Sequence, residues 1–230
     1  MAFYILSEVC DTPETGHVFP QIQKLKTGYD VQKPDSIYSH LKKSRNGFPD
    51  EVPDLDSFIL HGRAKPTDLV SNAIASGSGL FVSEKLKSIL SNHNLADHRF
   101  YPAKVAYKNK SIENYYWAQL MGNFTDTVDF TRSTFFIYKH YREDVGDIDI
   151  DSISDYNRKK AVLIGDNPGI NITIWAKRLC LYPSFFSRNF DLFKIGFFDT
   201  HYYISQSLRD ELIKSNITGC DIRATDRIIS

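Results

Sequence analysis

The sequence predicts an α+β fold in which strands and short helices are mixed without a regular βαβ rhythm. Two observations carry this prediction. A strand–helix–strand unit, "LFVSEKLKSILSNHNL", begins at Leu80, and a second one, "YYISQSLRDELIKSNI", begins at Tyr202, 122 positions later. Segments rich in β-branched and aromatic residues lie between the two units. We therefore expect a single domain over residues 1–230, with related parts over about 57–110 and 170–230.

Composition is that of an ordinary globular protein. The 230 residues are 42% apolar and 24% charged, which is a typical balance for a folded domain. A chain of this length buries enough surface to fold without a disulfide or a metal ion. The 28 basic residues equal the 28 acidic residues. This zero net charge argues against a protein that coats nucleic acid, because such binding depends on neutralising phosphates.

Cysteine usage and the first residues indicate where the protein works. The three cysteines are odd in number and have no metal-ligand spacing, which favours a reducing compartment. The opening "MAFYILSEV" has no basic segment typical of a signal peptide. No apolar run approaches the roughly 20 residues that cross a bilayer. We expect a soluble, cytoplasmic protein without a membrane partner.

The elements before the first unit are predicted in chain order. Residues 1–9 alternate loosely between apolar and polar and predict an opening strand. Residues 11–57 contain five prolines, which indicates a loop-rich surface. The segment "SFILHG" at 57–62 predicts a strand. Residues 66–76 predict a short helix.

The first unit carries the signals of a capped helix. Ser83 follows a strand-like apolar run and fits the N-cap position. The apolar stripe that follows has helical spacing and consists of Leu86, Ile89 and Leu90. Asn94 stands where a left-handed residue ends a helix. Residues 99–107 predict the next strand.

The second unit repeats these signals. Ser205 matches Ser83, and Asn216 matches Asn94. Only four of 19 aligned positions, 82–100 against 204–222, are identical. These identities fall on the cap, stripe and stop positions, which is what a shared strand–helix–strand geometry requires. Between the units lie the segments 114–120, 125–141, the acidic 143–155, 159–169 and 170–182, and several of them predict strands by their β-branched and aromatic content. Residues 165–169, "GDNPG", indicate a turn.

The repeated unit offers no catalytic chemistry. A serine nucleophile needs a positioned base, and neither Ser83 nor Ser205 stands in a Gly-x-Ser-x-Gly elbow. Helix capping explains both serines. No catalytic constellation, metal motif or cofactor motif is recognised elsewhere, and this favours a binding protein.

The most unusual segment is "EDVGDIDIDSISD" at 143–155, which holds six acidic residues and no basic one. It is either a solvated acidic loop or a negatively charged face for a basic partner, where complementary charge raises association rate and specificity. Asp147, Asp149 and Asp151 resemble the opening of a calcium loop. However, Ser152 and Arg158 occupy the positions where that loop requires Gly and Glu.

Two other function classes stay open. An enzyme, such as a hydrolase, would draw its site from His61, His140 and the aspartates. A nucleic-acid-binding or scaffold module would use the recurring aromatic pairs, although the basic residues are dispersed rather than gathered in a groove. A pocket with convergent ionisable groups would favour the enzyme. A broad acidic or aromatic face would favour a protein-binding role.

Three segments resemble a known family. They are "FVSEKLKSILSNHNLADHRFYPAKV", the central "YYWAQL" with "DTVDFTRSTFF", and the later "YYISQSLRDELIKSNITGCDI". They resemble the immunity-protein-eleven family of bacterial polymorphic toxin systems, over roughly 57–135 and 190–225. The resemblance implies an immunity protein, an antitoxin that is not an enzyme and that binds and neutralises one cognate toxin domain by occlusion. It supplies no catalytic residues.

The sequence thus leads to a specific set of expectations. We expect toxin binding, as a hypothesis, at Glu143, Asp144, Asp147, Asp149 and Asp151. Exposed aromatic residues in 1–56 or 182–203 are the alternative contact surface. We expect structural helix caps at Ser83, Asn94, Ser205 and Asn216. We expect neither a cofactor nor a nucleic-acid partner, and a homodimer is compatible with the sequence.

Overall fold

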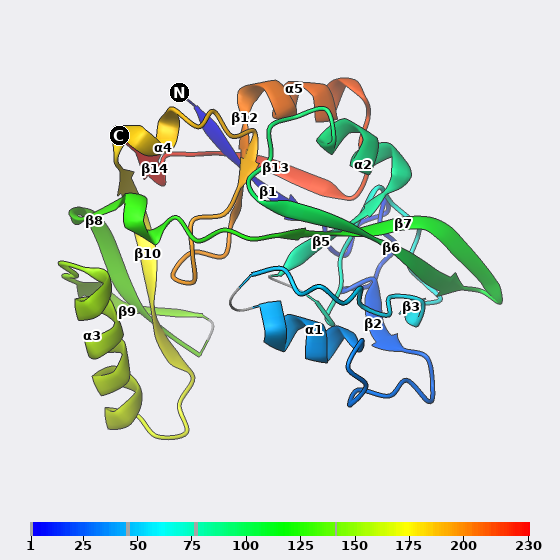
Figure 1. The fold of residues 1–230 in the computed structure, drawn as a ribbon, viewed down its shortest axis with the longest axis horizontal. Coiled ribbons are helices and arrows are strands. Elements are labelled where there is room, and N and C mark those ends of the chain that lie inside the picture. Colours follow the sequence, from blue (N-terminus) through cyan, green and yellow to red (C-terminus); the bar gives the residue numbers. More distant parts are fainter. Residues whose placement is uncertain (1, 45–46, 76–77, 141) are drawn as a thin grey trace.

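The protein has an α+β fold built from three β-sheets with helices on their outer sides (Figure 1). The computed structural model describes residues 2–44, 47–75, 78–140 and 142–230. Three hydrophobic clusters fill the spaces between these elements. None of the described helices has the length and apolar composition that crossing a bilayer requires.

The largest sheet has six strands in the order β2-β3-β6-β7-β5-β4. Their bounds are Ile22–Leu25 (β2), Phe58–Leu60 (β3), His98–Tyr107 (β6), Lys110–Leu120 (β7), Gly79–Ser83 (β5) and Leu69–Val70 (β4). Only the β3–β6 pair is parallel. Phe58, Phe81 and Trp117 are fully buried and form the centre of one cluster. Helix α1, Ile37–Lys43, lies beside this sheet, and its His40 packs edge-on against Trp117.

A second, four-stranded sheet brings the two ends of the chain together. Its order is β11-β12-β1-β13, and every pair is antiparallel. The bounds are Leu192–Phe193 (β11), Tyr202–Ser205 (β12), Phe3–Glu8 (β1) and Cys220–Thr225 (β13). Because β1 is central, its side chains alternate between two clusters: Phe3 and Ile5 enter one, and Leu6 enters the other.

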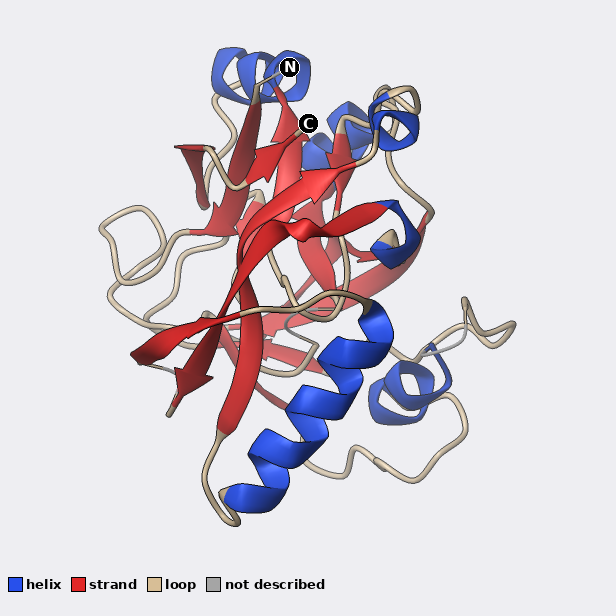
Figure 2. Ribbon diagram, turned by 90° about the vertical axis from the view of Figure 1, so that its left-hand side faces the viewer, coloured by secondary structure: helices blue, strands red, loops and turns tan. Residues whose placement is uncertain are grey.

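The third sheet also has four strands, in the order β14-β10-β8-β9. The bounds are Ile228–Ile229 (β14), Ile172–Leu181 (β10), Val128–Lys139 (β8) and Glu143–Ile148 (β9). A short 3-10 turn, Thr125–Thr127, leads into β8, and helix α4, Pro183–Phe186, follows β10. Helix α3, Ile153–Asp166, lies alongside this sheet (Figures 1 and 2). The hydroxyl of Tyr156 on α3 donates to the Ile174 carbonyl of β10 at 3.0 Å.

The two strand–helix–strand segments have the same geometry. The first is β5, α2 (Glu84–Leu90) and β6, and the second is β12, α5 (Gln206–Lys214) and β13. In each, one antiparallel strand separates the two strands that flank the helix: β7 in the first and β1 in the second. The Ser83 hydroxyl accepts from the amide of Leu86, and the Ser205 hydroxyl accepts from the amide of Leu208, both at 3.2 Å.

Asn94 differs from its expected role as a helix cap. Helix α2 ends at Leu90 with Ser91 as its C-cap, and Asn94 is not among the described residues with positive φ. Its side chain instead donates to the carbonyls of Arg188 and Asn189 at 2.8 and 3.1 Å. This long-range contact is invisible in the local pattern. Asn216 does adopt the left-handed conformation, with φ of 49°.

Two further expectations about elements were wrong. The described part of 66–76 is not helical and contains strand β4. Its backbone amides are used by distant residues: the amide of Ser71 donates to the side chain of Gln21, and the amide of Leu69 donates to the carbonyl of Thr218. Helix α3 begins at Ile153, within the acidic segment, and runs through to Asp166, so the expected turn begins later, near Asn167. Ser152 caps α3 by accepting from the amide of Asp155 at 3.1 Å.

Candidate functional site

The acidic residues singled out in the sequence lie along one edge of the third sheet. Glu143, Asp144 and Asp147 belong to β9, and Asp149 and Asp151 follow in the extended segment before α3. Among the described strands, β9 pairs with β8 alone and forms the end of its sheet. All five side chains are exposed, together with Val145, which is 56% exposed. The segment is therefore a charged strand edge rather than the loop that its composition suggested.

The backbone of β9 explains how an acidic, glycine-containing segment forms a strand. It follows β8 through a tight turn and pairs with it from Lys139 opposite Glu143 to Phe135 opposite Ile148. The register shifts between Ile137 and Tyr138, and Gly146 has φ of 139°, a conformation that favours glycine. Charge and irregularity on an edge strand also prevent unwanted edge-to-edge association, so the acidic edge selects which partners can pair with it.

Few of these carboxylates are neutralised within the protein. Among the residues that the structure describes, only Asp147 of the five is in an ion pair, 3.1 Å from the ammonium of Lys177. The carboxylate of Asp144 accepts from the amide of Gly146 at 3.0 Å. The ammonium of Lys159 donates a hydrogen bond to the backbone carbonyl of Asp149, at 2.7 Å, rather than to its carboxylate. Most of the negative charge on this edge is thus available to a partner.

Asp155, the last acid of the run, has a different role. Its carboxylate lies 2.8 Å from the ammonium of Lys159 and also contacts Arg158. The hydrogen bond from Lys159 is the main cause that lowers the pKa of Asp155 to about 2. Asp155 therefore stabilises the first turn of α3, where a negative charge is favoured, and does not belong to the outward surface.

An aromatic sheet face borders the acidic edge. Phe136 of β8 stands opposite Asp147 on one side and opposite Trp175 of β10 on the other. Tyr138 contacts both rings, with centroid distances of 5.8 Å to Phe136 and 6.3 Å to Trp175. All three rings are half-buried and belong to none of the hydrophobic clusters, whereas the adjacent Phe135 points into the core. Aromatic residues beside charged ones are typical of protein interfaces.

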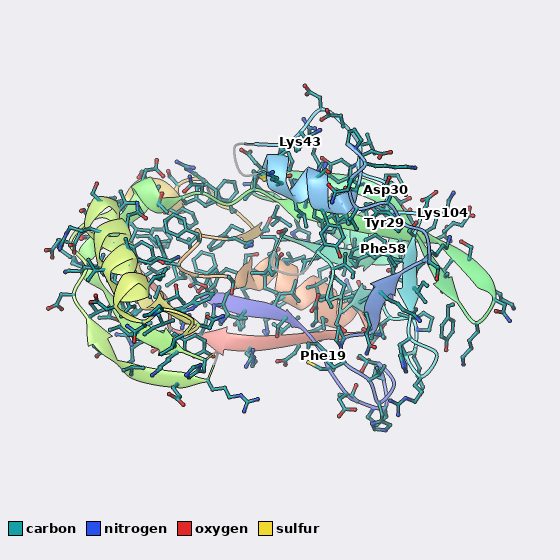
Figure 3. All side chains as sticks on the ribbon, turned by 90° about the horizontal axis from the view of Figure 1, so that it is seen from below. Phe19, Tyr29, Asp30, Lys43, Phe58 and Lys104 are labelled. Atoms are coloured by element: carbon teal, nitrogen blue, oxygen red, sulfur yellow. The ribbon has the colours of Figure 1, made fainter. Side chains whose placement is uncertain are left out.

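The alternative contact regions also expose aromatic side chains. Phe19 and Tyr38 are 55% and 44% exposed, and Tyr182 and Phe197 are 46% and 52% exposed. Figure 3 shows Phe19 on the outside of the molecule, while Phe58 lies within the ribbon. These residues are scattered over different elements, and isolated exposed apolar residues are common on protein surfaces.

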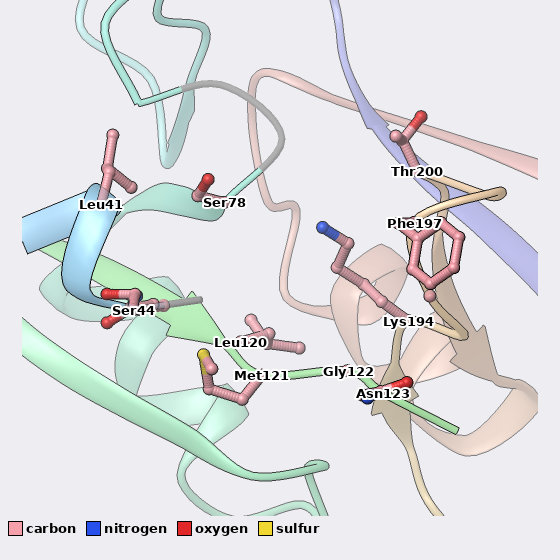
Figure 4. Close-up of a pocket in the computed structure, with 12 residues that line it drawn as sticks. Leu41, Ser44, Ser78, Leu120, Met121, Gly122, Asn123, Lys194, Phe197 and Thr200 are labelled. Atoms are coloured by element: carbon pink, nitrogen blue, oxygen red, sulfur yellow. The ribbon is translucent and has the colours of Figure 1, made fainter. Parts of the chain in front are cut away.

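Two neighbouring clefts open between the first and second sheets. One has a volume of about 480 Å³ and is lined by residues that include Ser44, Gln119, Lys194 and Thr200 (Figure 4). Its polar wall is internally bonded: the amide of Gln119 donates to Ser44 at 2.8 Å, and its oxygen lies 3.0 Å from the ring of buried His40. The other cleft, of about 440 Å³, shares Thr200. Sequence patterns missed both clefts, because their walls come from distant segments.

The cap serines are not arranged as nucleophiles. The Ser205 hydroxyl donates to Asp191 at 2.5 Å, and Asp191 lies 3.3 Å from His93. The carboxylate, rather than the imidazole, contacts the serine, so the histidine is not placed to accept the hydroxyl proton. The serine also accepts a backbone amide as a helix cap. Its environment is that of a structural residue.

The histidines proposed for a hydrolase site lie on separate sheets. His61 follows β3 and accepts from the amide of Arg63 at 3.2 Å, while His140 stands at the β8–β9 turn with φ of 51°. No hydrogen bond or ion pair joins them in the described structure. His201 is held by Asp199 at 2.6 Å, and that aspartate is also bound by Tyr203 and Arg227 in a buried network.

Metal binding finds no support among the described residues, where no group of three or more His, Cys, Asp or Glu could hold an ion. The calcium-loop likeness of Asp147, Asp149 and Asp151 fails structurally as well. Ser152 caps α3, and Arg158 binds Asp155.

The fold and this surface define an α+β protein with an acidic strand edge beside an aromatic sheet face. A family model described as "Immunity protein family (Imm11)" matches residues 10–162. The match spans more than half of the chain, so the chain belongs to this family. A search of curated proteins finds no match.

Proposed function

We propose that this chain protects its host by binding one cognate toxin domain of a polymorphic toxin system and occluding it, without catalysis. Membership of an immunity protein family carries the toxin-immunity part of this proposal. The finer part, inhibition by occlusion, is supported by the exposed acidic edge of β9 and by serines that serve as helix caps.

The proposed interface consists of Glu143, Asp144, Asp147, Asp149 and Asp151, with the aromatic face of Phe136 and Trp175 at its centre. Toxin inhibitors of this kind bury about 1,200–2,000 Å² in total. Apolar contact would come from the rings, and the acidic rim would steer a basic partner into place. If the toxin is a nuclease, the carboxylates of β9 stand in for substrate phosphates in its basic groove.

The cellular setting belongs to the same proposal. The described thiols of Cys10, Cys180 and Cys220 are all free, which agrees with a reducing cytoplasm. An exposed carboxylate edge repels phosphates, so it supports a protein partner over nucleic acid. The chain acts as one domain, because β1 and β13 from its two ends lie in the same sheet.

Co-expression with the cognate toxin tests the proposal. We expect wild-type protein to restore growth and to co-purify with the toxin. The triple variant Asp147→Asn, Asp149→Asn, Asp151→Asn should lose much of this protection. A control with the same charge change, Asp30→Asn, Asp35→Asn, Glu113→Gln, alters exposed acids on other elements and should protect fully. If wild-type protein gives no protection, the immunity function is refuted. Full protection by the first triple variant would refute only the acidic interface.

A further inference from the structure

The second cleft contains a buried phenol hydroxyl and a half-buried carboxylate within apolar walls. It lies beside the second half of β1, the beginning of β5 and residues 200–202. Leu6 and Leu80 supply apolar wall, while Glu8 and Tyr202 supply polar groups. Thr200 separates it from the first cleft, and Figure 4 shows this residue near Phe197 and above Lys194.

Glu8 and Tyr202 are neighbours on one face of the second sheet. The Cα partner of Tyr202 across the β1–β12 pair is Leu6. Glu8 follows Leu6 by two positions on the same strand, and residues two apart in a strand share a face. The negative charge of Glu8 contributes to raising the pKa of Tyr202, after burial, which is the larger cause. The carboxylate and the phenol thus sense each other inside the cleft.

Both groups lack a partner in the described structure. Tyr202 is 8% exposed, and its buried hydroxyl has no hydrogen bond. The carboxylate of Glu8 has no hydrogen bond or ion pair with any described residue, and burial alone raises its pKa to about 7. Buried polar groups are ordinarily paired, because an unsatisfied one costs its full desolvation energy. The buried, unpaired hydroxyl of Tyr202 and the unpaired, half-buried carboxylate of Glu8 lie on one cleft wall, which indicates a site whose ligand completes them.

The chemistry of the two groups selects a cation that carries N–H donors. A carboxylate accepts hydrogen bonds, and a phenol oxygen accepts one as well. A guanidinium presents five donors and binds a carboxylate with two of them. Leu6 and Leu80 would contact the aliphatic stem of such a side chain. The ammonium of Lys194 lies 5.0 Å from the centroid of the Tyr202 ring, and burial lowers its pKa.

We propose that this cleft binds the guanidinium or ammonium group of one basic side chain of the toxin, with Glu8 as its ion-pair partner and Tyr202 as an additional hydrogen-bond acceptor. This proposal rests on the proposed toxin-binding function, because the toxin supplies the cation. It adds a second, enclosed contact to the open acidic edge. Removing one partner of an enclosed, hydrogen-bonded charge pair at an interface weakens binding strongly, because the other charge is left buried and unpaired.

A small probe tests the site without the toxin. N-acetyl-arginine amide is titrated into the wild-type protein at constant ionic strength, and carboxyl NMR follows Glu8. N-acetyl-citrulline amide, which has the same shape but no charge, is the control ligand. We expect saturable binding of the arginine probe only, with the pKa of Glu8 falling from about 7. Glu8→Gln and Tyr202→Phe should weaken binding by at least about tenfold and threefold, and exposed Glu113→Gln should leave it unchanged.

Absence of charge-dependent binding to wild-type protein would overturn the proposal. The second arm measures toxin affinity for wild type, Glu8→Gln and Glu113→Gln, with folding checked by circular dichroism. Weaker toxin binding by Glu8→Gln alone supports the proposal. If the probe binds through Glu8 while toxin affinity is unchanged, the site serves a free small cation, and its assignment to the toxin is wrong. If wild-type protein binds no toxin, the immunity function itself fails, which is a separate result.

Discussion

The hydroxyl of Ser205 donates a 2.5 Å hydrogen bond to Oδ1 of Asp191. The second oxygen of Asp191 accepts from the backbone amide of Asn94, in the loop that follows the other helix, at 3.0 Å. One carboxylate therefore connects the cap of helix α5 to the loop after helix α2. A charged acceptor makes both hydrogen bonds strong.

The reciprocal connection also exists. The hydroxyl of Ser83 donates to Oδ1 of Asp68 at 2.6 Å, and Oδ2 of Asp68 accepts from the amide of Thr218 at 3.0 Å. Asp68 thus connects the cap of α2 to the loop after α5. The two aspartates join the two strand–helix–strand segments in both directions. We propose on this ground that the segments are a pseudo-repeat packed around an approximate twofold relation.

The aspartate links should contribute measurably to stability. We expect Asp68→Asn and Asp191→Asn each to lower the free energy of unfolding by about 1–3 kcal/mol, because hydrogen bonds to a charged acceptor are lost. Urea denaturation measures this loss, with exposed Asp50→Asn as the control. Burial by itself would raise the pKa of Asp68 and Asp191. Hydrogen bonds, chiefly those from Ser83 and Ser205, outweigh burial, so the pKa of each aspartate is lowered. Their contribution is therefore complete above about pH 4 and is lost at lower pH. A stability difference between wild type and variants that is the same at about pH 7 and at about pH 3 would contradict this assignment.

The cap hydroxyls provide a second prediction. Ser83→Ala and Ser205→Ala should each destabilise the protein by about 1–2 kcal/mol, because an amide in the first helical turn loses its acceptor. Ser88→Ala and Ser207→Ala alter exposed serines on the same helices and should be neutral or slightly stabilising, since alanine favours helix. Thermal unfolding followed by circular dichroism distinguishes the two pairs. If Ser83→Ala and Ser205→Ala destabilise the protein no more than Ser88→Ala and Ser207→Ala do, the capping role is refuted.

At Gly219, in the loop after α5, the effect of close packing on stability can be separated from the effect of backbone strain. Gly219 has φ of 79°, and a Cβ there would lie 2.1 Å from the carbonyl oxygen of Leu69. Gly28 has φ of 85° but open space around it. We expect Gly28→Ala to cost about 1–2 kcal/mol from conformation alone and Gly219→Ala to cost more than about 3 kcal/mol. Similar unfolding midpoints for the two variants would show that the close approach is not rigid.

Glu8 should make stability fall as pH rises. Its pKa is about 7 in the folded protein, against the ordinary value of 4.5 for a glutamate exposed to water, because burial disfavours the charged form. The folded state then holds the proton more tightly, so stability is complete below about pH 4.5 and declines by about 2–3 kcal/mol towards pH 7–8. Glu8→Gln should remove this decline, and Glu113→Gln should retain it. Denaturant midpoints measured across this range give the comparison, and a decline retained in Glu8→Gln would assign it to another group.

The sequence predicted those features that depend on local patterns. The strands and helices of the two segments, with Ser83 and Ser205 at the helix starts, follow from an apolar stripe and a capping residue. Helix α3 escaped prediction because only its Tyr156 is fully buried, so its apolar periodicity is weak. Strand β9 forms through its pairing with β8, and its composition alone indicated a loop.

The candidate site shows the same limit. The acidic run was recognisable as a charged surface, but its place on a strand edge beside Phe136 and Trp175 depends on sheet register. Glu8 and Tyr202 come from opposite ends of the chain and meet only because β1 pairs with β12. Contacts of this kind carry no local sequence signal.

The most direct test of the account is the affinity of purified protein for its toxin before and after the acidic edge is neutralised. The variant that neutralises all five acids should bind at least about tenfold more weakly than wild type. Its substitutions are Glu143→Gln, Asp144→Asn, Asp147→Asn, Asp149→Asn and Asp151→Asn. Its association rate should also depend less on salt, because electrostatic steering is lost. Unchanged affinity and unchanged salt dependence would contradict binding through the β9 edge.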